Sequence, residues 1–345
     1  EVTFFLLYLF EVDSVFCIIE VIYFKDVSKM VHSTRSKTLI SSSEAILNGL
    51  APDGGLYVFE ELKTLDLNAL KGKSYQEVAE VVLLHLLDDY SKASIKKIVG
   101  DTYNPVNFKE EAVTLKHLDN YSYLNLFNGP TFAFKDMALS ILPKLVNEAK
   151  FQNIMLKPSI VLTATSGDTG SAALSGFSGN DQNHIIVLYP TEGISEFQEI
   201  QMNSYQSETE HIYALNGNFD DCQNIVKELF LTVKPKTKTL TSANSINIGR
   251  LVPQVIYYVY SYLELLKEKK IKGRGQLNFC VPTGNFGNIY AAYIARELGV
   301  PIKKLIVASN QNNVLDDFFK TGIYSIDRTL DKSMSPSMDI IISSN

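Results

Sequence analysis

One lysine stands where an amine could take part in chemistry. Lys135 lies between Phe134 and Asp136, at the start of a helical pattern of apolar residues. Partial desolvation among apolar side chains lowers the pKa of a lysine amine and frees it to attack a carbonyl carbon. Such an amine would meet the requirement for a Schiff base and for a later general base. A solvated lysine at a helix start is the alternative interpretation.

A loop of glycines and amides could hold a phosphate. Residues 283–288 (TGNFGN) lie between a strand-like run and a helical pattern. Glycines let backbone N–H groups approach an anion, and the helix N-terminus adds a favourable dipole. The spacing differs from the usual nucleotide-binding fingerprints, and an ordinary tight turn is the alternative.

Two further stretches carry anion-binding groups. Residues 165–170 (TSGDTG) follow a strand-like run and offer N–H and O–H donors to a carboxylate, which we expect to place two anion sites on one sheet. Residues 244–250 (NSINIGR) bring together an amide, a hydroxyl and a guanidinium, a set suited to a phosphate ester. A surface loop is the alternative for the latter stretch.

Alternating strands and helices must position these loops. A helix after Lys135, bent at Pro143, precedes them, and residues 30–120 are mostly helical or turn-like in pattern. Such alternation predicts a mostly parallel sheet with helices on both faces and ligands at the carboxyl ends of the strands. We predict strands at residues 159–165, 184–189, 276–281 and 304–308, and helices at 254–270 and 287–298.

Composition limits the partner classes. The chain has 345 residues, a net charge of -6 and no long basic blocks, which argues against nucleic acid and anionic membranes as partners. Its three cysteines are far apart, and no Cys or His pair has the spacing of a zinc site, so we expect no metal and a reducing compartment. We predict a small-molecule substrate and a cytoplasmic location.

Seven short motifs carry a family resemblance because they occur together and in one order. With them, the chain from about Met30 to Asn345 closely resembles threonine synthases, of the pyridoxal-phosphate family that includes the tryptophan synthase β-subunit. The motifs are STR (33–35), GLAPDGGLY (49–57), FNGPTFAFKD (127–136), TSGDTG (165–170), NSINIGR (244–250), PTGNFGN (282–288) and SPSMDI (335–340).

The resemblance implies an α/β fold of type II pyridoxal-phosphate enzymes. It implies two domains with mostly parallel, helix-flanked sheets, and a mainly helical N-terminal segment before them. Residues 1–29 match nothing in the family and are expected to lie outside the folded unit. The expected segments are 30–120 (N-terminal), 121–240 (first α/β domain) and 241–345 (second α/β domain, incomplete at its C-terminus).

The resemblance also implies a role for each site residue. Lys135 is the catalytic lysine that binds pyridoxal 5'-phosphate as a Schiff base. The residues expected to bind the cofactor phosphate are Gly284, Asn285, Phe286, Gly287 and Asn288. Those expected to bind the substrate carboxylate are Ser166, Asp168 and Thr169, and those expected to bind the substrate phosphate are Asn244, Ser245 and Arg250.

The implied reaction converts O-phospho-L-homoserine and water to L-threonine and phosphate. Lys135 moves protons at the α and β carbons while the pyridoxal ring stores charge. Family members continue beyond the SPSMDI motif, into the part that supplies the hydroxyl partner of the pyridine nitrogen. Two alternatives therefore stay open: a phospholyase that forms a keto acid, and a pyridoxal-phosphate-binding protein without turnover. A monomer or a homodimer is expected.

Overall fold

The computed structural model describes residues 31–343 except 156, 180, 181, 192 and 274. It also describes a short antiparallel strand pair, β1 (Glu11–Val12) and β2 (Val15–Phe16). The predicted extension 1–29 lies, apart from these two strands, outside the described residues.

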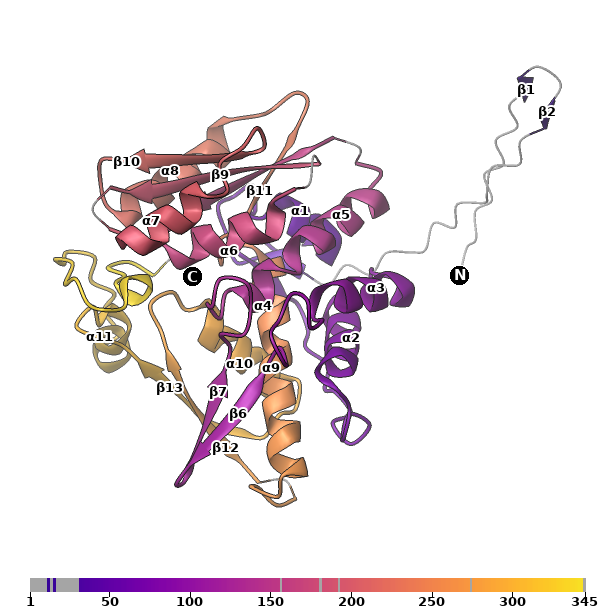
Figure 1. Ribbon diagram of the computed structural model, residues 1–345, viewed down its shortest axis with the longest axis vertical. Helices are drawn as coiled ribbons and strands as arrows, with labels where there is room; N and C mark the ends of the chain where they lie inside the picture. The colour runs from indigo at the N-terminus through magenta and orange to yellow at the C-terminus, as the bar shows by residue number, and fades with distance from the viewer. Residues whose placement is uncertain are drawn as a thin grey trace.

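A four-stranded parallel sheet forms the upper part of the molecule (Figure 1). Its strands are rich in β-branched residues, which favour extended backbone. They lie in the order β10-β9-β8-β11, and each neighbouring pair is parallel. Their bounds are β8 (Ser159–Ala164), β9 (Asn183–Pro190), β10 (Glu210–Leu215) and β11 (Thr239–Ser242).

Helices cover both faces of this sheet because successive strand residues point to opposite sides. Val161 packs in the main core with α6, whereas Leu162 and Ala164 pack in a smaller core with Cys222 and Val226 of α8. The connecting helices are α6 (Asp168–Phe177), α7 (Glu196–Asn203) and α8 (Phe219–Thr232).

The strand order reverses beside β8. The chain runs outward from β8 to β9 and β10, then returns to place β11 on the other side of β8. Loops at such a switch point diverge and leave a crevice at the carboxyl ends of the strands. Residues 165–170 leave β8 there, and residues 243–247 leave β11 beside them.

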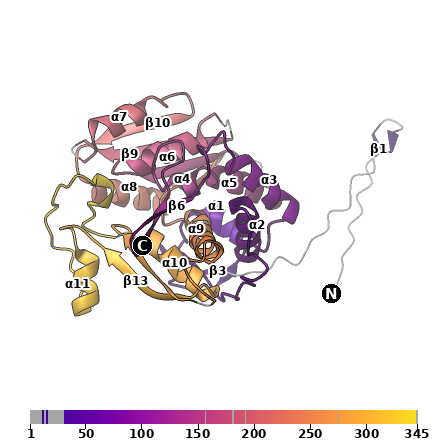
Figure 2. The same ribbon diagram turned by 60° about the horizontal axis from the view of Figure 1, so that its bottom comes forward.

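A long buried helix, α9 (Ile248–Lys267), runs through the centre of the fold. Almost all its side chains are buried, as expected for a helix that is apolar on every side. Figure 2 shows α9 nearly end-on, among helices from distant parts of the chain. Its neighbours include α1 (Ser42–Asn48), α2 (Tyr75–Leu86), α4 (Asp136–Leu139), α5 (Leu142–Gln152) and α10 (Gly287–Glu297).

A second, two-stranded parallel sheet lies below the first (Figure 1). It pairs β12 (Leu277–Pro282) with β13 (Ile302–Ala308), and α10 connects the two strands. The remaining elements are α3 (Lys92–Thr102), α11 (Val314–Thr321), the 3-10 helix η1 (Pro336–Met338), and the antiparallel strands β3 (Val31–Ser33), β4 (Leu39–Ile40), β5 (Tyr57–Phe59), β6 (Thr114–Leu118) and β7 (Tyr121–Asn125).

The predicted α/β fold with mostly parallel, helix-flanked sheets is confirmed, and the four predicted strands and two helices are present. Three details differ. The helix after Lys135 is interrupted before Pro143 rather than bent. Helix α9 begins six residues earlier than predicted, because Asn247 caps it and Pro253 is tolerated inside it. The N-terminal part also contains a small antiparallel sheet, whose two- and three-residue strands are too short to show an alternating pattern.

Candidate active site

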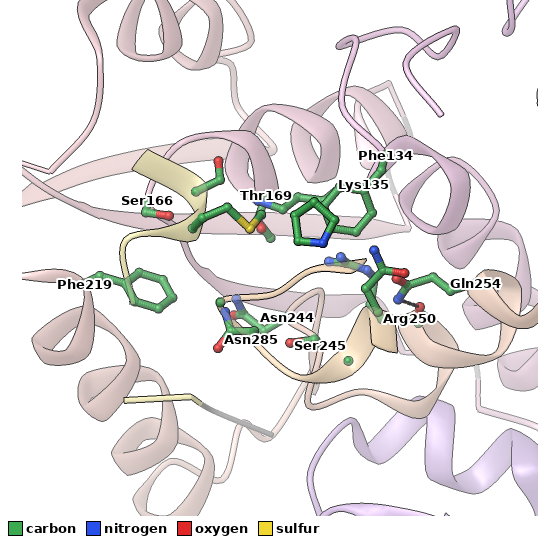
Figure 3. A pocket seen from close by; sticks show the side chains of 16 residues that line it. Phe134, Lys135, Ser166, Thr169, Phe219, Asn244, Ser245, Arg250, Gln254 and Asn285 are labelled. Carbon is green, nitrogen blue, oxygen red and sulfur yellow. Dashed lines mark hydrogen bonds between the residues drawn. The ribbon is translucent and has the colours of Figure 1, made fainter. Parts of the chain in front are cut away.

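One pocket collects ten of the twelve predicted site residues (Figure 3). It encloses about 570 Å³, including the part that is open to solvent. Phe286 and Asp168 do not line it. The predicted residues that do are Lys135, Ser166, Thr169, Asn244, Ser245, Arg250, Gly284, Asn285, Gly287 and Asn288.

The two anion loops do not share a sheet, contrary to expectation. The TSGDTG loop follows β8 of the four-stranded sheet, whereas the TGNFGN loop follows β12 of the separate two-stranded sheet. Each loop does sit at the carboxyl end of a parallel strand. The sequence predicted the strand ends but could not specify which strands pair.

Lys135 is a buried amine at the start of α4. Its residue is only 8% exposed, and its Nζ lies 3.7 Å from Oδ2 of Asp168. Burial lowers the pKa of the Lys135 amine; the Asp168 carboxylate opposes this lowering and the Arg250 guanidinium adds to it. The amine therefore loses its proton more readily than an ordinary lysine, as a nucleophile or general base requires.

Asp168 lies in the first turn of α6, where a negative charge is favoured by the helix dipole. Gln198 Nε2 donates to its Oδ1 at 2.6 Å, and the Ser337 hydroxyl donates to its Oδ2. Burial by itself would raise the pKa of Asp168, but Lys135, Ser337 and Gln198 outweigh burial and lower it. Asp168 is therefore a fixed carboxylate that faces Lys135.

The TSGDTG loop is shaped by its own threonine. Thr165 Oγ1 accepts hydrogen bonds from the backbone N–H groups of Gly167 (2.9 Å) and Gly170 (2.8 Å). The N-cap residue of α6, Gly167, has no side chain to cap the helix, and Thr169 in its first turn lines the pocket beside Ser166. A helix N-terminus with adjacent hydroxyls is a suitable site for a carboxylate.

The segment between β11 and α9 is held against β8 by Asn244. Its Oδ1 accepts from the Ala164 N–H (2.9 Å) and its Nδ2 donates to the Ala164 carbonyl (2.6 Å). Most of the Asn244 amide is therefore used to fix the loop at the switch point. One N–H of Nδ2 is left for the pocket, which Asn244 lines together with Ser245.

Arg250 is a buried guanidinium in the first turn of α9. It is 3% exposed, and its Nη1 donates to the Ala243 carbonyl. Its Nε is buried and has no hydrogen-bond partner among the described residues. Burial lowers the pKa of Arg250 to about 10, despite opposing contributions from Tyr257 and Asp136. An unsatisfied buried cation beside a pocket fits an anionic ligand.

The N-terminus of α10 forms another wall of the pocket. The N-cap residue Phe286 makes no side-chain cap bond to this helix, and Gly284, Asn285 and Gly287 line the pocket there. Asn288 Oδ1 accepts from the hydroxyls of Tyr257 (2.5 Å) and Tyr258 (2.7 Å). The Asn288 carbonyl oxygen is thus satisfied, which leaves its NH₂ group to donate toward an anion in the pocket.

Phe286 does not line the pocket, and it contacts Ser343 and α11. Its N–H donates to the Ser343 hydroxyl at 3.2 Å, and its ring packs on Phe319 with centroids 6.1 Å apart. The side chain therefore stabilises the start of α10 against α11.

Several lining residues were not predicted from the sequence. Ser337 and Met338 belong to the SPSMDI motif, which had signalled the region but not a role for either residue. A Cβ on Gly284 would lie 2.7 Å from Cγ1 of Ile340, so this segment passes directly over the α10 loop. Phe134 and Pro282 also line the pocket and belong to the FNGPTFAFKD and PTGNFGN motifs, which had given neither residue a role. Phe219 and Gln254 line it too, although no motif includes them.

The described residues contain neither a helix that could span a membrane nor a cluster that could bind a metal ion. No helix in residues 31–343 is both long and apolar enough to cross a membrane. No group of three or more His, Cys, Asp or Glu side chains in that part of the chain could hold a metal ion.

Known proteins share this fold and sequence. The family model for the threonine synthase N terminus matches residues 31–103. The threonine synthase of Methylobacillus glycogenes is 40% identical over 329 residues, with 91% of this chain and 68% of that protein covered. Human threonine synthase-like 1 is also 40% identical, over 88% of this chain but only 43% of its own length.

A solved structure agrees. The PLP-bound threonine synthase from Brucella melitensis has a TM-score of 0.79 and 38% identity, with 92% of this chain and 68% of that one covered. The fold and site thus define a chain of the fold type II class of pyridoxal-phosphate enzymes. Within that class, the chain belongs to the threonine synthase family. It spans less than half the length of threonine synthase-like 1.

Proposed function

We propose that the protein is a pyridoxal-phosphate-dependent threonine synthase, which converts O-phospho-L-homoserine and water to L-threonine and phosphate. One observation carries the proposal. A buried lysine amine, a buried arginine with an unsatisfied Nε and the N-termini of two helices converge on a single pocket. The substrate and the cofactor together bring one carboxylate and two phosphate groups, which match the guanidinium and the two helix N-termini.

The residues present fit pyridoxal phosphate. The N-terminus of α10 and the NH₂ group of Asn288 would hold the cofactor phosphate, and Lys135 Nζ would hold the cofactor at its aldehyde carbon. When bound, the cofactor supplies an electron sink for charge that develops on the substrate. Phe134, whose ring centroid lies 5.9 Å from Lys135 Nζ, helps to exclude water from the amine.

The substrate would be held at both ends. Ser166 and Thr169 at the start of α6 would bind its carboxylate, and Arg250 with Ser245 and Asn244 would bind its phosphate. Asp168 carries a negative charge that would repel a carboxylate, so we place it beside Lys135 rather than on the substrate. Two fixed ends orient the carbon chain between them and reduce the entropy lost in reaching the reactive geometry.

Lys135 would then move the protons. Its lowered pKa lets the amine accept a proton from the α carbon, and the nearby Asp168 carboxylate stabilises the ammonium that results. Arg250 would stabilise the phosphate as it leaves the γ carbon. The segment that carries Ser337 and Met338 closes one side of the pocket and limits the access of solvent.

Colour and product analysis test the proposal. The full-length chain purified with pyridoxal phosphate should show a visible absorbance band, and Lys135→Ala should lose it. Lys150→Ala is a matched control, because Lys150 is also buried but donates to the Gln182 carbonyl outside the pocket. A colourless wild-type protein would refute the cofactor assignment.

Incubation with O-phosphohomoserine should release phosphate and yield threonine. A keto acid in place of threonine would identify a phospholyase. Retained colour without any product would identify a binding protein. The human relative carries the name threonine synthase-like 1, so the product must be identified rather than assumed.

We also propose a cytoplasmic protein that acts as a monomer or homodimer on a small molecule. The modest net charge of -6 and the few, widely spaced cysteines support this setting. We propose that residues 30–120, 121–240 and 241–345 are its structural units. Residues 239–242 form β11 within the first sheet, so limited proteolysis would test the units by cleavage in the turn between β6 and β7 and in the segment 233–238 before β11.

A further inference from the structure

Asp168 is held by groups from three separate elements besides its own helix. Lys135 at the start of α4 lies 3.7 Å away, Gln198 of α7 donates at 2.6 Å, and Ser337 of η1 donates to the oxygen that faces Lys135. Gln198 is nearly buried, at 9% exposed. Among these groups, Gln198 is the one whose side chain is also fixed at its other end, by Ser195.

Gln198 has two contacts that fix its orientation. It is the third residue of α7, and its Oε1 accepts from both the N–H and the hydroxyl of Ser195 at 3.1 Å in a capping box. With Oε1 satisfied in this way, the NH₂ group must lie on the other side, against Asp168. Because the same amide bonds both the α7 N-terminus and Asp168, the position of the α7 N-terminus fixes the position of the Asp168 carboxylate.

The choice of glutamine is informative. Glutamate and glutamine serve equally well at this place in a capping box. Of the capping boxes in the described residues, those of α1, α2 and α8 use an acid, namely Glu44, Glu77 and Asp221, and only that of α7 uses an amide. An acid in α7 would cap the helix but would place a second carboxylate against Asp168.

The neighbouring glycine shows that the contact is tightly fitted. Gly167 has φ +127°, and a Cβ at this position would overlap the amide of Gln198. The loop before α6 therefore has the one residue type that leaves room for the Gln198 side chain.

We propose that Gln198 is a positioning residue, which keeps the Asp168 carboxylate ionised and directed at Lys135 and so tunes the amine. The inference rests on the proposed function of Lys135. Asp168 on α6 and Arg250 on α9 are the charged groups that face Lys135, and Asp136 lies beside them. Gln198 acts on Lys135 only through Asp168.

Two substitutions should change Lys135 in opposite directions. Gln198→Ala removes the donor that orients Asp168, so the carboxylate can turn away from the ammonium and Lys135 should deprotonate more easily. Gln198→Glu keeps the cap but adds a carboxylate, which the positive charges of Lys135 and Arg250 keep ionised, so Lys135 should deprotonate less easily.

Trace acetylation of the cofactor-free, full-length chain measures this directly. Acetic anhydride labels the neutral amine, and peptide mass spectrometry compares Lys135 with exposed lysines between pH 6 and pH 10. At a fixed pH below the titration of Lys135, its relative labelling should rise roughly tenfold in Gln198→Ala and fall roughly tenfold in Gln198→Glu. The label needs no cofactor, so a colourless protein would refute the proposed function and still leave this test readable.

Glu77→Gln is the matched control, since it makes the reverse exchange in the capping box of α2 and should leave Lys135 unchanged. Labelling of Gln198→Glu that matches the wild type at every pH would show that Gln198 is only a helix cap. The same direction of change in both variants would also overturn the proposal, because it would indicate a general loosening of α7.

Discussion

Arg250 offers a test in which stability and ligand binding should move in opposite directions. Its guanidinium is buried, and its Nε lacks a partner among the described residues. We expect Arg250→Met to stabilise the protein in the absence of a phosphate ligand and to abolish the response to phosphate. The reason is that a buried cation without a full set of partners costs free energy until an anion binds.

The magnitude follows from the pKa. Burial lowers the pKa of Arg250 from 12.5 to about 10, which corresponds to roughly 3 kcal/mol against the charged form in the folded state. Because the folded-state pKa is the lower one, this cost is fully present below pH 10 and is relieved only as the pH rises toward 12.5. Removal of Arg250 leaves the Ala243 carbonyl without its donor, at a cost of about 1–2 kcal/mol. The net gain at neutral pH should therefore be about 1–2 kcal/mol.

Urea unfolding of the cofactor-loaded protein, with and without 10 mM phosphate (roughly 1.4 kcal/mol of stabilisation for a Kd of about 1 mM), is the appropriate assay. The loaded form is used so that the α10 N-terminus is already filled. Wild type should gain stability with phosphate, and Arg250→Met should not. Arg296→Met is the control, since Arg296 lies on the surface of α10 and pairs with Glu297.

Two outcomes would refute this expectation. An Arg250→Met protein that is less stable than wild type without phosphate would mean that the guanidinium is well satisfied in the fold. A variant that phosphate still stabilises by the wild-type amount would mean that phosphate binds elsewhere.

Three further predictions concern stability. Gly167→Ala should lower the free energy of unfolding by more than about 2 kcal/mol in urea titrations, because φ +127° is strained for alanine and its Cβ would overlap Gln198. A change below about 0.5 kcal/mol, the size typical of a neutral surface substitution, would contradict this prediction. Asn247→Ala should lower the free energy of unfolding by about 2–4 kcal/mol in the same assay. The reason is that the buried amide donates to the Ile46 and Ser242 carbonyls and caps α9. An unchanged urea midpoint would show that these bonds contribute little. Burial raises the pKa of the Cys222 thiol to about 11, so its alkylation by iodoacetamide should remain slow up to pH 9 while exposed Cys280 reacts. The Cys222 contribution to stability should fall as the pH rises from about 9 toward 11. Equal labelling rates of the two thiols in the native protein would count against this burial.

Much of the local structure could be predicted because it depends on short-range interactions. The capped helix α1, the strand β8 and the glycine loop before α10 each follow from neighbouring residues in the sequence. The motifs likewise indicated which loops carry anion-binding groups. Arg250, which was predicted from the NSINIGR motif, belongs to a helix rather than a loop.

Pairings between distant segments could not be predicted in this way. Ser337 and Asp168 are 169 positions apart in the sequence, and nothing near either residue indicates the other. Gln198 would be described from the sequence as a helix-capping residue, and only its packing on Gly167 reveals the contact with Asp168. The same holds for Asn244, whose amide is largely used by Ala164 at the end of β8.

The sequence by itself determined that Lys135 lies at the start of a helix and that the TSGDTG and TGNFGN loops each lie between a strand and a helix, because backbone conformation there is set by nearby side chains. Only the tertiary structure decided that β11 returns beside β8, that the TGNFGN loop belongs to a second sheet, and that Gln198 and Ser337 meet Asp168. Those contacts depend on how whole elements pack. Burial, which lowers the pKa of Lys135, is likewise a property of the assembled fold.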